Sequence, residues 1–191
     1  MQNTTTYMNY KHKELVEACA KNDRNAQMKI YDLYYSTMYN VSIRIVNDSF
    51  IAEDIMQESF LDAFSKLDTF EWRSSFGSWL KRIVINKSLD TIRKNNMHIQ
   101  PIDEISDIPN DEAYTDYEQI ECRLEEVKIA LKRLSENYKV ILLLHLFEGY
   151  DHKEISQILE LPYNNVRVRY IRAKRKLLEE IVKSRAQHVL N

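Results

Sequence analysis

The sequence predicts an all-α protein: two small helical domains joined by an extended acidic linker. Only two of the 191 residues are glycine and three are proline, where average usage would give roughly 12% for the two together. Sheets and tight hairpins depend on glycine for turns with positive φ, so this composition disfavours a sandwich or a barrel. Apolar residues also recur at helical spacing over long stretches, and charge changes sharply along the chain.

Charge divides the chain into three segments. Residues 1–96 carry a net charge of +1, residues 97–126 of −9 and residues 127–191 of +6. The acidic segment holds two of the three prolines and shows no sustained apolar period, which is typical of a linker. The expected organisation is a first domain at 8–96, a linker at 97–119 and a second domain at 120–188.

The first domain is predicted to contain three long helices. Asp23 is a suitable N-cap for a helix over about 24–46, and a polar break separates it from a second helix over about 50–67. A third helix is predicted over about 76–94. The second helix is expected to turn four apolar residues toward the core, namely Ile51, Ile55, Leu61 and Phe64.

The third helix also carries a polar row, which consists of Trp79, Arg82, Asn86, Asp90 and Arg93. Spacings of three and four residues place this row on one face. Arginine can hold phosphate in a bidentate manner, asparagine can read a base edge and aromatic rings can stack on unpaired bases. The row therefore indicates a polynucleotide surface, although a core position for Trp79 is the alternative.

The loop before this helix adds aromatic and basic side chains, at Phe70, Trp72 and Arg73. On the second helix, Asp54, Gln57 and Glu58 form an exposed acidic and amide surface. From periodicity alone, an ordinary solvated helix face is the alternative interpretation of this surface.

The second domain is predicted to contain a helix-turn-helix. Asp151 and Glu154 form a capping box at the start of a short helix, and Pro162 begins a longer one that runs to about Lys183. Two unequal helices joined by three or four residues fit this motif. Gly149 is expected to end the helix that precedes the motif.

The last helix is expected to have one apolar and one basic face. The apolar row contains Val166, Tyr170, Ala173, Leu177 and Ile181. The other face and its flank contain Asn164, Asn165, Arg167, Val168, Arg169, Arg172 and Lys176. Between residues 167 and 185 the net charge is +6. These features predict a recognition helix in the major groove of DNA, where arginine and asparagine bind base edges and valine contacts a thymine methyl group.

Several motifs together resemble the extracytoplasmic-function (ECF) sigma factors of bacterial RNA polymerase, over about residues 10–185. "AEDIMQESFLDAF" is similar to the polymerase-binding helix of sigma domain two, and "FGSWLKRIVINKSLDTIR" to its promoter-melting helix. "LSENYKVILLLHLFEGYDHKEISQIL" and "VRVRYIRAKRKL" resemble sigma domain four.

The resemblance implies a function in transcription initiation. Asp54, Gln57 and Glu58 would meet the clamp helices of the largest subunit of core RNA polymerase. Two further sets would bind promoter DNA. The minus-ten element would be melted and bound by Phe70, Trp72, Arg73, Trp79, Arg82, Asn86, Asp90 and Arg93. The minus-thirty-five element would be read by Asn164, Asn165, Arg167, Val168, Arg169, Arg172 and Lys176. The linker would occupy the path of nascent RNA, and a membrane-bound anti-sigma factor is an expected partner.

The chain departs from the family pattern near the recognition helix. Glu160 stands where glycine is common, and Asn164 and Asn165 stand where a Gly-Thr or Gly-Ser pair is usual. Asparagine tolerates positive φ and can cap a helix, so the fold is expected to survive and the base preference to differ.

Other functions receive less support. Cys19 and Cys122 lie far apart without Cys or His neighbours, which predicts free thiols in a reducing cytoplasm and no metal site. We expect no cofactor, no catalytic residues and no membrane insertion. An autonomous helix-turn-helix regulator explains the second domain alone, and a helical adaptor would leave the basic residues merely solvated.

Overall fold

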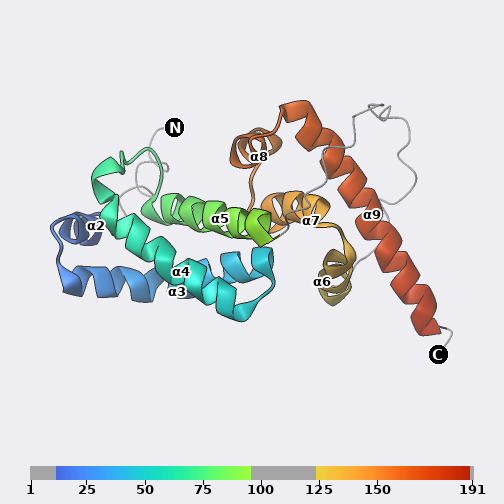
Figure 1. Cartoon of the computed structure of the whole chain (residues 1–191), viewed down its shortest axis with the longest axis horizontal. Coiled ribbons are helices and arrows are strands. Elements are labelled where there is room, and N and C mark those ends of the chain that lie inside the picture. The colour runs from blue at the N-terminus through green and yellow to red at the C-terminus, as the bar shows by residue number, and fades with distance from the viewer. Residues whose placement is uncertain (1–11, 96–123, 190–191) are drawn as a thin grey trace, which may run out of the picture. The chain divides into compact units, whose positions relative to one another are not determined.

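The computed structural model describes residues 12–95 and 124–189, whose regular structure is helical throughout, so the all-α prediction is confirmed (Figure 1). The chain divides into two compact units, Met1–Ile99 and Gln100–Asn191. The predicted linker, residues 97–119, lies outside the described residues. The bounds predicted for the linker and for the two domains stay predictions.

In the first unit three long helices pack against one another. Within residues 12–95 the elements are α2 (Lys13–Ala20), α3 (Arg24–Val46), α4 (Ser49–Ser65), the 3₁₀ turn η1 (Leu67–Thr69) and α5 (Phe76–Asn95). Each of α3, α4 and α5 contacts the other two, and α2 packs against α3 (Figure 1). The main core of this unit therefore lies among α3, α4 and α5.

Aspartate side chains fix where two of these helices begin. Asp23 accepts hydrogen bonds from the backbone N–H groups of Asn25 and Ala26, which confirms the predicted N-cap of α3. Asp48 accepts from Phe50 and Ile51 at 3.0 Å each and caps α4 in the same way. Each cap satisfies backbone donors that have no partner within the helix.

The prediction that Leu61 points into the core is wrong, because its side chain is 69% exposed. Helix α4 contacts both α3 and α5, and its buried side is formed by Ala52, Ile55, Met56, Ser59, Phe60 and Ala63. Leu61 follows Asp54 by seven residues and falls on the remaining, outward side. Ile55 is buried as predicted.

Cys19 in α2 is buried and free. Burial, together with the negative charge of Asp23, raises the pKa of its thiol from 9.0 to about 11. The reactive thiolate form is therefore scarce at neutral pH.

Over residues 124–189, the second unit contains four helices and one π-helical turn. The elements are α6 (Leu124–Arg133), α7 (Glu136–Leu142), the π turn η3 (Leu143–Phe147), α8 (His152–Leu159) and α9 (Tyr163–Val189). The helix that Gly149 was predicted to end is not regular throughout: its last turn widens, as the bond from Glu148 N–H to the Leu143 carbonyl shows. Gly149 follows with φ of 77°, the left-handed conformation common after a helix end.

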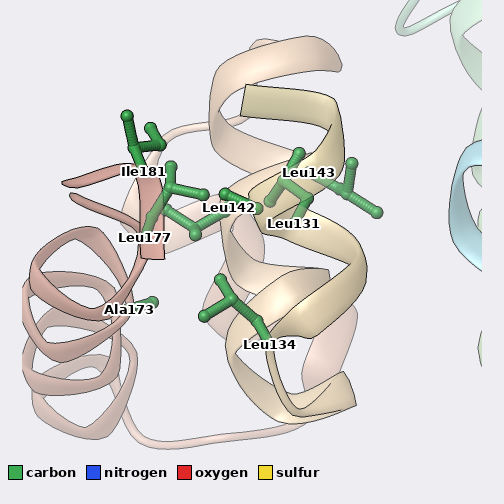
Figure 2. Packing of buried hydrophobic residues seen from close by; sticks show 8 residues of the cluster. Leu131, Leu134, Leu142, Leu143, Ala173, Leu177 and Ile181 are labelled. Atoms are coloured by element: carbon green, nitrogen blue, oxygen red, sulfur yellow. The ribbon is translucent and has the colours of Figure 1, made fainter. Parts of the chain in front are cut away.

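Helices α6, α7 and α9 enclose an apolar core together with η3. Figure 2 shows its side chains meeting from these elements, and all of them are buried: Ala130, Leu131, Leu134, Leu142, Leu143, Ala173, Leu177 and Ile181. The predicted apolar row of α9 thus lies in the core, with Tyr170 packed at its edge.

Ion pairs join α6 to the carboxy-terminal half of α9. Arg185 binds Glu126 in a bidentate manner, with Nε 3.0 Å from Oε1 and an Nη nitrogen 2.7 Å from Oε2. Arg133 lies 3.8 Å from Glu180. Bidentate arginine–carboxylate pairs are the geometrically specific ones, so α9 is tied to α6 well beyond the helix-turn-helix.

Candidate functional site

The polar row of α5 lies along one side of a continuous helix. Asn86, Asp90 and Arg93 are exposed, whereas Trp79 and Arg82 are half-buried. Arg93 and Asp90 form an ion pair, with 3.3 Å between nitrogen and oxygen. The carboxyl-terminal end of the row is therefore paired, and Asn86 presents its amide to solvent in the middle.

The aromatic loop before α5 is partly a core element. Phe70 is only 7% exposed, and its ring centre lies 4.8 Å from that of Trp72, 5.0 Å from Trp79 and 6.0 Å from Phe76. The expectation that Phe70 is a surface residue facing DNA is wrong, because these rings enclose it. Phe70 instead packs against the rings of the two tryptophans and supports them.

Trp72 has an unusual backbone conformation, with φ of 57°. Positive φ in a bulky residue is rare, and such strain concentrates at functional sites. The ring of Trp72 is half-buried, and Nζ of Lys13 lies 5.8 Å from its centre. Arg73 is exposed and pairs with Glu71 at 2.7 Å. Trp72 and Arg73 therefore project from a loop that Phe70 anchors.

The predicted acidic surface lies on the outward side of α4, where Asp54, Gln57 and Glu58 are all exposed. The Gln57 amide donates to Glu53 at 3.3 Å. Leu61 extends this side by one turn and adds an apolar group. The surface is thus acidic with an apolar end.

Glu58 has a partner that the sequence did not indicate. Nζ of Lys87, on α5, lies 2.9 Å from Oε2 of Glu58 and 3.1 Å from Oδ2 of Asp62. Glu58 and Lys87 are 29 residues apart. Local spacing therefore gives no sign of this pair, which only the packing of α4 against α5 creates.

In the second unit, the helix-turn-helix begins with the predicted capping box. Asp151 accepts from the Glu154 N–H at 2.7 Å, and Glu154 accepts from the Asp151 N–H at 2.8 Å. Glu160 ends α8 in the left-handed conformation, with φ of 56°. This is the position where the family often has glycine, and the backbone conformation gives the physical reason for that preference. Asn164 lies in α9 and Asn165 donates its backbone N–H to the Pro162 carbonyl, so neither adopts positive φ.

Most of the predicted basic face of α9 is accessible. Asn164, Arg167 and Lys176 are exposed, and Asn165, Arg169 and Arg172 are half-buried. Lys176 also lies 5.9 Å from the centre of the Tyr138 ring. The amino-terminal half of α9 therefore presents amides and guanidinium groups together.

The prediction for Val168 is wrong, because its side chain is only 4% exposed. Helix α9 packs against α7 and α8 as well as α6, so its buried side is wider than one apolar row. Val166 and Val168 are both buried there. No thymine contact is available to Val168 in this arrangement.

A cluster of rings that joins the π turn η3 to the two helices of the helix-turn-helix was not predicted. His145 and His152 have ring centres 5.1 Å apart, and each packs on Tyr170. The Nδ1 atom of His145 lies 2.9 Å from the Tyr150 carbonyl oxygen, while Nε2 of His152 is buried without a hydrogen-bond partner among the residues described. Burial lowers the pKa of His152, and the proximity of His145 lowers it further.

No group of three or more His, Cys, Asp or Glu residues in 12–95 and 124–189 is arranged to hold a metal ion. In the same ranges no helix is long and apolar enough to cross a membrane.

Comparison with known families assigns both units. Residues 30–97 match the family Sigma-70 region 2, and residues 124–177 match Sigma-70, region 4. The first match contains α4 and α5, and the second contains the helix-turn-helix and part of α9. The two regions occur in the order expected from the sequence motifs.

Curated relatives are similar over nearly the whole chain. The ECF RNA polymerase sigma factor SigW of Bacillus subtilis is 27% identical over 182 residues, covering 88% of this chain and 96% of the relative. The RNA polymerase sigma-H factor of Pseudomonas aeruginosa is 26% identical over 174 residues, covering 84% and 89%.

Solved structures share the fold. The sigma factor RpoE of Bartonella quintana, crystallised with the anti-sigma factor NepR, superimposes with a TM-score of 0.56 at 23% identity, covering 81% of this chain and 95% of that one. CnrH in complex with the cytosolic domain of CnrY gives a TM-score of 0.53 at 20% identity, covering 85% and 92%.

Proposed function

The chain belongs to the ECF sigma factors of bacterial RNA polymerase, and on that premise we propose how its surfaces divide the steps of initiation. It is an initiation factor that binds RNA polymerase and directs it to promoters, and its family is not one of enzymes. Its place of action is the cytoplasm, where polymerase and promoter DNA are found.

The outward side of α4 binds the polymerase. Asp54, Gln57 and Glu58 offer carboxylate and amide oxygens to basic groups on the clamp helices of the largest subunit, and Leu61 adds apolar contact at one end. Charge complementarity of this kind speeds encounter and fixes the register of a complex. The linker, residues 97–119, follows the path of nascent RNA as an acidic mimic.

The polar row of α5 and its loop open the minus-ten element. Unpairing a base costs a few kcal/mol, and stacking on an aromatic ring returns about 1–3 kcal/mol per base. Trp72 and Trp79, supported by Phe70, provide the aromatic surface, and Asn86 binds the extruded base. Arg73, Arg82 and Arg93 hold the backbone, which for Arg93 requires exchanging Asp90 for phosphate.

The amino-terminal half of α9 reads the minus-thirty-five duplex. Asn164, Asn165, Arg167, Arg169 and Arg172 supply donors to bases and phosphates, and Lys176 adds a phosphate contact. Val168 has no place in this set because it is buried. Phosphate contacts make the binding dependent on salt concentration.

The observation that carries this proposal is the presence, in one chain and in family order, of the polar row of α5, with Asn86 exposed at its middle, and a basic helix-turn-helix. Transcription by core polymerase from a cognate promoter, with and without the full-length protein, tests it. We expect promoter-specific initiation only when both are present. Duplex binding that is equally tight without polymerase would instead favour an autonomous regulator.

Two variants test the DNA-binding surface of α5 and the polymerase-binding surface of α4 separately. Asn86→Ala should slow open-complex formation and leave polymerase affinity intact, whereas Asp54→Asn should weaken polymerase binding. If Asn86→Ala weakens polymerase binding instead, the role assigned to α5 is wrong.

An anti-sigma factor is a further proposed partner. Both similar structures above are of complexes, and one of them is of a sigma factor bound to an anti-sigma factor. Affinity purification of the tagged chain from its own cells, followed by identification of a stoichiometric membrane-bound partner, tests this expectation. Recovery of polymerase alone would contradict it.

A further inference from the structure

Lys87 of α5 joins the two helices that carry the proposed polymerase and promoter surfaces. Its ammonium nitrogen lies 2.9 Å from Oε2 of Glu58 and 3.1 Å from Oδ2 of Asp62, both on α4. The two carboxylates stand about one helical turn apart, so the ammonium group bridges them. Lys87 thereby fastens one turn of α4 to the turn of α5 that carries Asn86.

The two carboxylates differ in their exposure to solvent. The side chain of Glu58 is 66% exposed and that of Asp62 38%, while Lys87 itself is 26% exposed. Water and salt weaken an exposed ion pair more than a shielded one. Asp62 is therefore the partner better shielded from water, and Glu58 is the partner that a competing basic group reaches from solution.

Lys87 is held in its charged form by this arrangement. Burial works against the charge, but hydrogen bonds to Glu58 and Asp62 and their negative charges raise the pKa of Lys87 overall. The bridge is consequently present throughout the neutral pH range. Without Lys87, the two carboxylates would face each other as like charges at i and i+4, which is unfavourable on a helix.

We propose that Lys87 is a positioning residue: its bridge to α4, called the coupling below, holds α5 in place for promoter opening while α4 is bound to polymerase. The inference rests on the function proposed above. When a basic group of the polymerase replaces Lys87 at Glu58, Asp62 still holds Lys87, so α5 keeps its place while α4 is engaged. Lys87 contacts neither polymerase nor base in this scheme, and it fixes how α5 presents Asn86.

Two substitutions at Lys87 and one at Asp62 test the coupling in the full-length protein. Lys87→Met keeps the aliphatic stem and removes the charge, whereas Lys87→Arg keeps the charge. Asp62→Asn removes the charge of the better-shielded partner. Lys29→Met, at an exposed lysine of α3, is the matched control for loss of one positive charge. Each variant is assayed for core polymerase affinity and, at saturating polymerase, for the rate of open-complex formation.

We expect Lys87→Met and Asp62→Asn to slow open-complex formation about five- to tenfold while polymerase affinity stays unchanged. Lys87→Arg should open promoters at nearly the wild-type rate, and Lys29→Met should match wild type in both assays. A promoter already unpaired at the minus-ten element should restore Lys87→Met, because the step that depends on α5 has been bypassed.

Three results would overturn the coupling: a wild-type opening rate in Lys87→Met, an equal defect in Lys87→Arg, or no restoration by the unpaired promoter. Asp54→Asn and Asn86→Ala, assayed alongside, keep the two proposals separate. If neither changes its own measurement, the surfaces assigned to α4 and α5 fail, and the coupling fails with them. If both behave as expected and Lys87→Met is normal, only the coupling fails.

Discussion

Gly77 lies against the ring of Tyr34 so closely that a Cβ atom added to Gly77 would stand 2.7 Å from Cε1 of Tyr34. The ring has little freedom to retreat, because it packs edge-on against Phe76, which is almost fully buried. A glycine in the first turn of α5 is therefore what allows α3 and α5 to approach each other here. The contact also sets the start of the helix that carries Asn86.

Gly77→Ala should lower the free energy of unfolding of the first domain by about 1–3 kcal/mol, the usual cost of overpacking. Alanine would otherwise favour a helix over glycine, so a loss of stability identifies the steric contact as its cause. Both tryptophans of the chain, Trp72 and Trp79, lie in this domain, so tryptophan fluorescence in a urea titration follows it selectively.

The double variant Gly77→Ala/Tyr34→Leu provides the control. Removing the ring should make the alanine much better tolerated than it is beside Tyr34. Independent, additive losses would show that the two residues do not interact.

Glu160→Gly should stabilise the second domain by about 0.5–1 kcal/mol, because Glu160 holds a left-handed conformation that glycine adopts without steric cost. Glu160→Gln keeps Cβ and removes the charge, so it should have little effect. Urea unfolding followed by far-ultraviolet circular dichroism measures both. Equal stabilisation by Gln and Gly would attribute the effect to charge rather than to the backbone.

Arg172→Ala should weaken binding of a minus-thirty-five duplex by about 1–3 kcal/mol if its guanidinium contacts a base. The fold should persist, since Arg172 is half-buried at the surface of α9. Fluorescence anisotropy with labelled duplex, repeated at two salt concentrations, measures the loss. A variant that binds the cognate and a scrambled duplex equally less well would place Arg172 on phosphate instead.

Val168→Ala should behave in the opposite way. Its side chain is buried, so truncation should lower the stability of the second domain by about 1.5–3 kcal/mol. Under conditions where the domain remains folded, base preference should be unchanged. Altered preference at a thymine position, without a loss of stability, would restore Val168 to the DNA surface.

Acid should destabilise the second domain through His152. Burial lowers the pKa of His152 below its ordinary 6.5, against the smaller opposing charge of Asp151 and with help from His145 and Arg167. The unfolded chain then takes up the proton at a higher pH than the folded chain does. Stability is therefore unaffected by His152 above about pH 6.5, the ordinary pKa that the unfolded chain retains, and it is lost as the pH falls from there through the lower pKa of the folded chain.

Unfolding at a series of pH values between neutral and mildly acidic measures this dependence. His152→Phe keeps a ring beside Tyr170 but cannot titrate, so the stability of the second domain should change less with pH than in wild type. An identical pH profile in the variant would exclude His152 as the source.

Features that depend only on residues close together in the sequence were well predicted. The Asp23 cap, the Asp151–Glu154 capping box and the left-handed Gly149 all follow from local backbone requirements. The concentration of basic residues on α9 is likewise visible without any knowledge of packing.

Errors arose where a helix contacts more neighbours than one apolar row suggests. Val168 is buried because α9 packs on three helices, and Leu61 is exposed because the buried side of α4 is displaced from it. Phe70 belongs to a loop with several polar residues, yet its ring packs there against three other aromatic rings. These outcomes depend on tertiary contacts that periodicity does not encode.

Side-chain pairs between different elements were not predicted from the sequence, for a related reason. Lys87 and Glu58 belong to different helices, and His145 and His152 lie on either side of the turn that contains Gly149. Neither pair has a characteristic spacing. Both nevertheless determine how the proposed surfaces are held.

The pairing of Arg185 with Glu126 sets a practical boundary for dissecting this protein. The match to region 4 ends at residue 177, but Ile181 belongs to the core and Arg185 still binds α6. A fragment cut at the end of the match would expose the apolar side of α6 and leave Glu126 without its guanidinium. An isolated DNA-reading fragment should therefore extend past Arg185, and a carboxy-terminal fusion should be separated from α9 by a flexible spacer.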